Sequence, residues 1–222
     1  MTNEPTLDPA VENERNPLPS ALLILLSAPS GGGKTTLWQQ LLAHHPEVTR
    51  ACTCTTRPPR PNERDGIEYY FLDPGDFLKR VQAGEFLEHA TVYGHSYGIL
   101  KSEVLGKLRQ GKDVILCVDV QGAATICARA REDAHLQHAL VTVFLTPATF
   151  AELEARLTRR GTDSPEVLET RLNLAHHEIA QWKNFQYLIT STTIPEDLRR
   201  MEAIIEAERM RQIRVSEPSY RT

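Results

Sequence analysis

The feature that most constrains this chain is a glycine-rich turn set between an apolar run and a helical pattern. Residues 21–26 (ALLILL) are all apolar, which predicts a strand buried on both faces of a sheet. Residues 28–35 (APSGGGKT) follow, and residues 35–45 then show helical periodicity. This order matches the phosphate-binding P-loop, GxxxxGK[ST], with Ala28 at the first glycine position. Alanine is small, so we expect the loop to form and to bind a nucleotide.

The chemistry of such a loop assigns roles to its residues. Glycines let backbone N–H groups turn towards phosphate oxygens, and the helix N-terminus adds partial positive charge. Lys34 can reach the β- and γ-phosphates of ATP, and the Thr35 hydroxyl can ligate the Mg²⁺ that accompanies ATP. The expected ATP-binding residues are Ala28, Pro29, Ser30, Gly31, Gly32, Gly33, Lys34, Thr35 and Thr36.

Apolar runs and helical stretches alternate through the rest of the chain. The runs at 114–118, 140–145 and 187–190 precede helical stretches at 121–131, 147–159 and 195–213. This alternation predicts an α/β protein, a P-loop NTPase three-layer fold with a parallel central sheet. We expect a core of residues 20–50 and 101–214, a leader at 1–19 without fixed structure and a tail at 215–222.

Two segments break this alternation. Residues 51–100 contain short β-like pieces at 68–72 and 86–93, and they predict a small mixed insertion. Residues 159–165 combine arginine, glycine and small polar residues between two helices, which predicts an arginine-bearing lid over about 156–172.

Composition excludes several classes of protein. A hydrophobic share of 41% and a charged share of 24% are typical of a globular chain, and a net charge of −4 argues against a nucleic-acid partner. The longest apolar run is far too short to span a bilayer, so we expect no membrane partner. The four cysteines lack zinc-site spacing, which favours free thiols and a cytoplasmic location. Nothing in the sequence fixes an oligomeric state.

A proline-stiffened segment places two arginines three residues apart. In residues 53–61 (TCTTRPPRP) the prolines restrict the backbone, so Arg57 and Arg60 can address one phosphate at little ordering cost. The planar guanidinium group of arginine can donate two parallel hydrogen bonds to a phosphate. The alternative for this segment is a solvated basic turn.

Residues 55–71 (TTRPPRPNERDGIEYYF) resemble the GMP-binding signature of guanylate kinases, TTRxPRxxExxGxxYxF. Further matches follow in order at 86–88 (FLE), 93–98 (YGHSYG), 118–122 (VDVQG) and the arginines of 156–162, so the resemblance covers roughly residues 20–205. It implies an enzyme that moves the γ-phosphate of ATP to GMP, with residues 20–214 as the kinase domain and 51–100 as its GMP-binding insertion.

The resemblance also implies roles for individual residues. Arg57, Arg60, Tyr69 and Tyr97 would hold the GMP phosphate, while Thr53, Glu88 and Asp119 would surround the guanine. Arg160 and Arg171 would contact ATP phosphates, and the catalytic set would be Lys34, Arg57, Arg160 and Arg171. The role of Glu88 agrees with its chemistry, because a carboxylate can accept both the N1–H and the N2–H of guanine.

The chain departs from the family pattern at three places. Ile99 stands where a threonine or serine is usual, Cys117 stands where an acid is frequent, and residues 190–193 (TSTT) replace an Asn-Asp pattern near the adenine. Two alternatives follow: an inactive interaction module of the same fold, and a P-loop kinase with another phosphorylated acceptor. The intact Lys34 and Thr35 argue against the first, and Glu88 argues against the second.

Overall fold

The computed structural model describes residues 20–92, 94–159 and 165–215, with the side chain of Pro165 excepted. The predicted leader, Arg160 with the centre of the predicted lid, and the tail from residue 216 lie outside these ranges.

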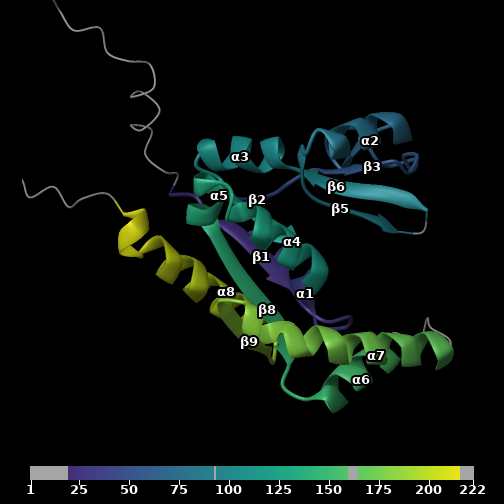
Figure 1. The fold of residues 1–222 in the computed structure, drawn as a ribbon. Helices are drawn as coiled ribbons and strands as arrows, with labels where there is room; N and C mark the ends of the chain where they lie inside the picture. Colours follow the sequence, from purple (N-terminus) through teal and green to yellow (C-terminus); the bar gives the residue numbers. More distant parts are fainter. Residues whose placement is uncertain (1–19, 93, 160–164, 216–222) are drawn as a thin grey trace, which may run out of the picture.

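A five-stranded parallel sheet forms the centre of the molecule (Figure 1). Its strands follow the order β2-β7-β1-β8-β9, and each neighbouring pair is parallel. The bounds are β1 (Leu23–Ser27), β2 (Val48–Arg50), β7 (Asp113–Cys117), β8 (Leu140–Pro147) and β9 (Tyr187–Ser191). The four predicted apolar strands are confirmed, whereas the short edge strand β2 was not predicted.

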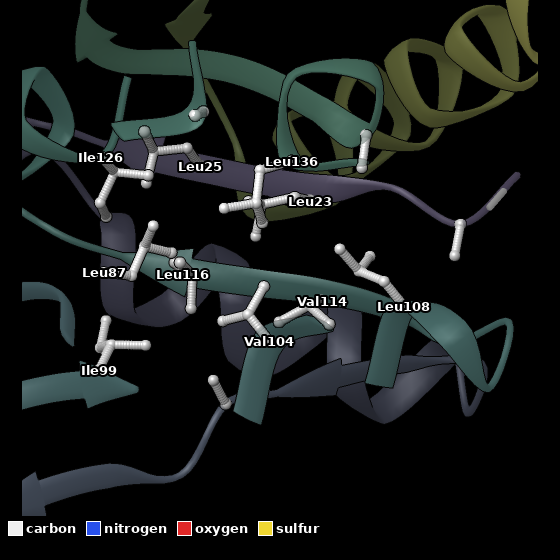
Figure 2. Packing of buried hydrophobic residues seen from close by; sticks show 14 of the residues in the cluster. Leu23, Leu25, Leu87, Ile99, Val104, Leu108, Val114, Leu116, Ile126 and Leu136 are labelled. Atoms are coloured by element: carbon white, nitrogen blue, oxygen red, sulfur yellow. The ribbon is translucent and has the colours of Figure 1, made fainter. Parts of the chain in front are cut away.

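Helices cover both faces of this sheet, which confirms the three-layer prediction. Leu23 and Leu25 of β1 point to one face and pack among residues of the helices there (Figure 2), while Ile24 and Leu26 point to the other. The first face is covered by α3 (Lys101–Arg109), α4 (Val120–Ala130) and α5 (Ala134–Ala139). The second is covered by α1 (Lys34–His44) and α8 (Ile194–Arg209).

A second, mixed sheet has the strand order β4-β3-β6-β5. Strands β3 and β4 are parallel, and the β3–β6 and β6–β5 pairs are antiparallel. These elements and α2 project together from the central sheet (Figure 1). The bounds are β3 (Thr53–Thr55), β4 (Tyr69–Phe71), α2 (Pro74–Gln82), β5 (Phe86–Val92) and β6 (His95–Leu100).

The second sheet has its own small core, in which one glycine is required. Phe86 stacks on Phe77 with ring centroids 4.5 Å apart, beside the buried Cys54. A Cβ on Gly98 would lie 2.6 Å from a ring carbon of Phe86, closer than carbon atoms can approach. Glycine at residue 98 therefore lets β6 pass directly over the Phe86 ring.

Helices α6 (Phe150–Arg159) and α7 (Pro165–Ala180) form an antiparallel pair next to the carboxyl end of β8 (Figure 1). A short 3₁₀ turn, η2 (Gln181–Asn184), leads from α7 to β9. The prediction of a helix from residue 147 was wrong at its start, because Pro147 still belongs to β8. The helix begins after Thr149, whose hydroxyl oxygen accepts a 3.2 Å hydrogen bond from the Glu152 N–H.

The turn that follows α8 is held against the central sheet by a buried ion pair. Helix α8 stops at Arg209 rather than at residue 213 as predicted, and the 3₁₀ turn η3 (Gln212–Arg214) follows. The buried Arg214 side chain donates to the Glu208 carboxylate and, at 3.1 Å, to the His138 carbonyl. Glu208 also accepts a hydrogen bond from the Tyr187 hydroxyl at 2.5 Å.

Candidate functional site

The loop between β1 and α1 turns at two glycines with positive φ. Gly31 has φ 83° and Gly33, the N-cap of α1, has φ 98°, a conformation that residues with a Cβ rarely adopt. The Gly32 N–H closes the turn on the Pro29 carbonyl at 2.9 Å. Among the described residues, no side chain caps α1, so the partial positive charge of its N-terminus faces the turn. The loop forms with Ala28 at its first position, buried at 2% exposure.

Lys34 connects this loop to the neighbouring strand. Its Nζ donates a 2.9 Å hydrogen bond to the Val118 carbonyl, just beyond the carboxyl end of β7. The Lys34 side chain is half-buried, whereas Thr35 and Thr36 are exposed on the first turn of α1. Lys34 is thereby held next to the loop, with the threonine hydroxyls on its open side.

The end of β7 also contacts the second sheet. Asp119 caps α4, because one of its carboxylate oxygens accepts the Gly122 N–H at 2.7 Å. The Cγ of Glu88 lies 3.5 Å from the position that a Cβ on Gly122 would take. Burial raises the pKa of Glu88, the charge of Asp119 raises it further, and the Arg129 charge opposes this rise. Glu88 and Asp119 therefore lie near each other between the two sheets.

Arg57 is fixed in a cluster of polar and aromatic groups. Its Nη2 donates to both carboxylate oxygens of Glu63 at 2.9 Å, and its guanidinium lies 5.5 Å from the centre of the Tyr69 ring. Tyr69 meets Tyr97 edge to face, with centroids 6.2 Å apart. Glu63 also accepts the Arg60 backbone N–H at 2.8 Å, while the Arg60 side chain is exposed. The cluster presents a cation and two phenols, which are groups that bind phosphate.

A pocket of about 180 Å³ lies between the central and second sheets. The second sheet contributes Thr53, Tyr69, Tyr97 and Ile99 to its lining, and the carboxyl end of β7 contributes Cys117. The structure therefore brings together three residues that were expected to bind one nucleotide, Thr53, Tyr69 and Tyr97. It places the exposed Arg60 side chain away from the lining of this pocket.

A larger pocket of about 330 Å³ lies on the other side of the phosphate loop. Gly31, Gly33 and Thr36 line it together with Arg156 and Thr192, so it is continuous with the residues expected to bind ATP. The guanidinium of Arg156 is held within 3.2 Å of the Ser191 hydroxyl. Ser191 in turn donates to the buried Asp197 carboxylate at 2.7 Å.

Sequence reasoning missed two acidic residues at the site. Glu63 belongs to the motif at residues 55–71, but the sequence assigned it no role, because its ion pair with Arg57 forms only in the folded turn. Glu178, on α7, accepts the Ser30 N–H at 3.0 Å across 148 residues of sequence, so no local pattern could have indicated it. Of the two arginines expected on the lid side, Arg171 lies on α7, and Arg160 lies outside the described residues.

The comparisons with known proteins agree with this geometry. The family model described as guanylate kinase matches residues 20–208. The chain is 39% identical over 193 residues to a guanylate kinase of Novosphingobium aromaticivorans, covering 87% of this chain and 85% of that relative. It is 38% identical over 196 residues to one of Clostridium perfringens, covering 88% of each. A crystal structure of guanylate kinase from Anaplasma phagocytophilum superposes with a TM-score of 0.65 at 29% identity, covering 88% of this chain and 90% of that one.

Proposed function

Because this chain belongs to the guanylate kinase family and is a kinase, we propose that it transfers the γ-phosphoryl group of Mg·ATP to GMP, giving GDP and ADP. The observation that carries this proposal is the position of the carboxyl end of β7. Residues 117–119 lie between the phosphate loop, through the Lys34 contact to Val118, and the pocket of the second sheet. One end of the central sheet thus adjoins a site for each nucleotide.

On the donor side, the loop residues 28–36 would bind the ATP phosphates. The uncapped N-terminus of α1 and the charge of Lys34 support this role, because both favour an anion. The pocket beside Arg156 and Thr192 would take the adenosine part. Among the described residues, no three His, Cys, Asp or Glu side chains are arranged to hold a metal ion. Mg²⁺ would enter as part of Mg·ATP, with the exposed Thr35 hydroxyl as its protein ligand.

On the acceptor side, Arg57, Tyr69 and Tyr97 would hold the GMP phosphate, and Arg60 would join them when the acceptor binds. Thr53, Glu88 and Asp119 would surround the guanine. An ionised Glu88 accepts the two adjacent N–H donors of guanine, whereas adenine presents an acceptor at N1 and would be repelled. Its position near Asp119, at the start of α4, supports this role.

The chemistry needs positioning and cations rather than a dedicated base, because the acceptor phosphate is already anionic at neutral pH. Lys34, Arg57, Arg160 and Arg171 would surround the reacting oxygens and stabilise the charge that spreads over the transferring group. Closure of the second sheet and of the segment at about 156–172 would exclude water, which is a competing acceptor.

The cellular setting is also a proposal. None of the described helices combines the length and the apolar composition that crossing a bilayer requires. All four cysteines are free thiols, which supports the cytoplasm as the compartment of this enzyme.

The proposal is tested by measuring ADP production with Mg·ATP and a panel of GMP, dGMP, AMP, CMP and UMP. We expect turnover with GMP and its collapse in Lys34→Ala. Turnover with another acceptor at higher kcat/KM than GMP would contradict the assigned substrate. A folded protein that binds GMP but turns over no acceptor would instead favour an interaction module.

A further inference from the structure

Glu178 is a buried carboxylate that reaches the phosphate loop from α7. It is 7% exposed, and its Oε2 accepts the Ser30 N–H at 3.0 Å. Among the described residues it is also the one from outside the loop segment that lines the pocket of about 300 Å³ formed by residues 28–36. In Figure 1, the loop after β1 passes next to α7, in agreement with this contact.

The surroundings of Glu178 explain how a carboxylate is accommodated there. Burial raises its pKa, whereas the Ser30 N–H and the charge of Lys34 lower it, and Asp119 raises it slightly again. A buried acceptor of this kind is stabilised only while its hydrogen-bond donor stays in place. The contact therefore fixes both the helix and the third residue of the loop.

A second contact joins the same two parts. Leu157 of α6 packs against the loop so closely that a Cβ on Gly31 would lie 2.9 Å from its side chain. Leu157 also belongs to the apolar cluster that holds α6 against α7 through Ala175. The helix pair thus rests on two consecutive loop residues, with an apolar contact at Gly31 and a polar contact at Ser30.

The position of Glu178 on α7 relates it to the arginine of that helix. Arg171 precedes Glu178 by seven residues, close to two full turns, so both residues occupy the same side of α7. A rotation or shift of α7 that breaks the Ser30 contact would move Arg171 with it. The position of Arg171 relative to the loop therefore depends on where Glu178 is held.

We propose that Glu178 is a positioning residue for phosphoryl transfer. Its contact with Ser30 holds α7 on the phosphate loop and so positions Arg171 relative to the ATP phosphates. This inference rests on the proposed function, because the arginine is expected to act on ATP phosphates. Glu178 acts through the loop and through Arg171, and it makes no contact with the transferring group.

The test compares four variants in steady-state kinetics and in equilibrium binding of a fluorescent ATP analogue. Glu178→Ala removes the acceptor, Glu178→Asp shortens its reach, and Glu178→Gln keeps an oxygen for the Ser30 N–H. Glu206→Ala, an exposed glutamate on α8 and outside the segment at about 156–172, is the matched control. We expect Ala and Asp to lower kcat/KM for ATP about 10- to 100-fold with the KM for GMP changed less than about threefold, and Gln and the control to stay near wild type.

Equal loss in Glu178→Gln and Glu178→Ala would overturn the proposal, because the acceptor would then not be what matters. Equal rises in the KM for ATP and for GMP, in step with a lowered Tm, would assign Glu178 to stability alone. If Glu178→Ala does not fold, Glu178→Asp decides. If the wild type lacks GMP kinase activity the proposed function fails, yet weaker binding of the ATP analogue by Glu178→Asp would still support the loop contact.

Discussion

Replacing Glu88 with glutamine should strengthen the fold while weakening GMP binding. In the folded chain, burial and the neighbouring charge of Asp119 raise the pKa of Glu88 above its ordinary value. Below the unfolded-state pKa the residue is neutral in both states and costs nothing. As the pH rises from the unfolded-state pKa to the raised folded-state pKa, the unfolded chain loses the Glu88 proton first, so the folded state loses stability. Above the raised pKa the half-buried carboxylate is ionised and this loss is complete. At pH 7 the neutral amide should therefore give a higher Tm, and the difference should disappear near pH 4.

The same substitution removes the charged acceptor that we propose for guanine. Glutamine offers one oxygen and, on the other side, an N–H₂ group that faces a guanine donor. Losing one hydrogen bond to a charged group costs about 1.5–3 kcal/mol, which is about 10- to 150-fold in affinity. We expect the KM for GMP to rise by that factor while the KM for ATP stays within about twofold, and the preference for GMP over AMP to fall.

Glu132→Gln is the matched control, since it makes the same change of net charge at an exposed residue in the turn between α4 and α5. Thermal unfolding from pH 4 to 8 and initial rates at varied GMP and AMP provide the measurements. A Glu88→Gln protein that is less stable than the wild type at pH 7 would refute the cost of ionising Glu88 in the folded state. A Glu88→Gln protein that keeps the wild-type KM for GMP would refute the placement of Glu88 against the guanine.

Four other outcomes are expected. Lys34→Ala should lower kcat by about 10³-fold with the Tm little changed, because a preorganised cation next to the reacting phosphate is lost. Arg57→Lys should raise the KM for GMP about tenfold or more in the same assay, since an ammonium group cannot donate the two parallel hydrogen bonds of a guanidinium to a phosphate. Arg214→Ala should lower the free energy of unfolding by about 3–5 kcal/mol in urea titrations, against little change for Arg211→Ala. Two glutamate side chains raise the pKa of His45 above its ordinary value, so the protonated His45 stabilises the fold fully below pH 6.5, and this effect is lost as the pH rises through the raised pKa. His45→Gln should therefore lower the Tm more at pH 6 than at pH 9.

Parts of the fold that follow from local pattern could be read from the sequence. The all-apolar run at 21–26 and the glycine turn after it predicted β1, the loop and α1 together, because burial on both faces demands an unbroken apolar strand. Helix α2 was missed although Asp73 and Pro74 mark its start, since the surrounding glycines and prolines favoured an irregular reading. Strands β2 and β3, three residues each, are defined by pairing with distant strands rather than by their own sequence.

Some residues of the candidate site could likewise be predicted from the sequence, and others could not. Arg57, Tyr69 and Tyr97 were expected together because a sequence motif carries them, and they meet in one cluster. The partners that fix the site, such as Glu63 on Arg57 and Glu178 on Ser30, belong to turns and helices whose approach is set by tertiary packing. Asp119 was expected only to bind guanine, but it also has a structural role, because it is the N-cap of α4.

The close passage of Gly98 over the Phe86 ring has an evolutionary consequence. Any other residue at 98 would force the ring aside, and with it the stacked Phe77 and the strand that carries Glu88. A descendant of this chain could therefore enlarge residue 98 only after residue 86 had become smaller. The two positions should therefore change in a fixed order, because a lineage that enlarged residue 98 while Phe86 was still present would lose the alignment of its proposed acceptor site.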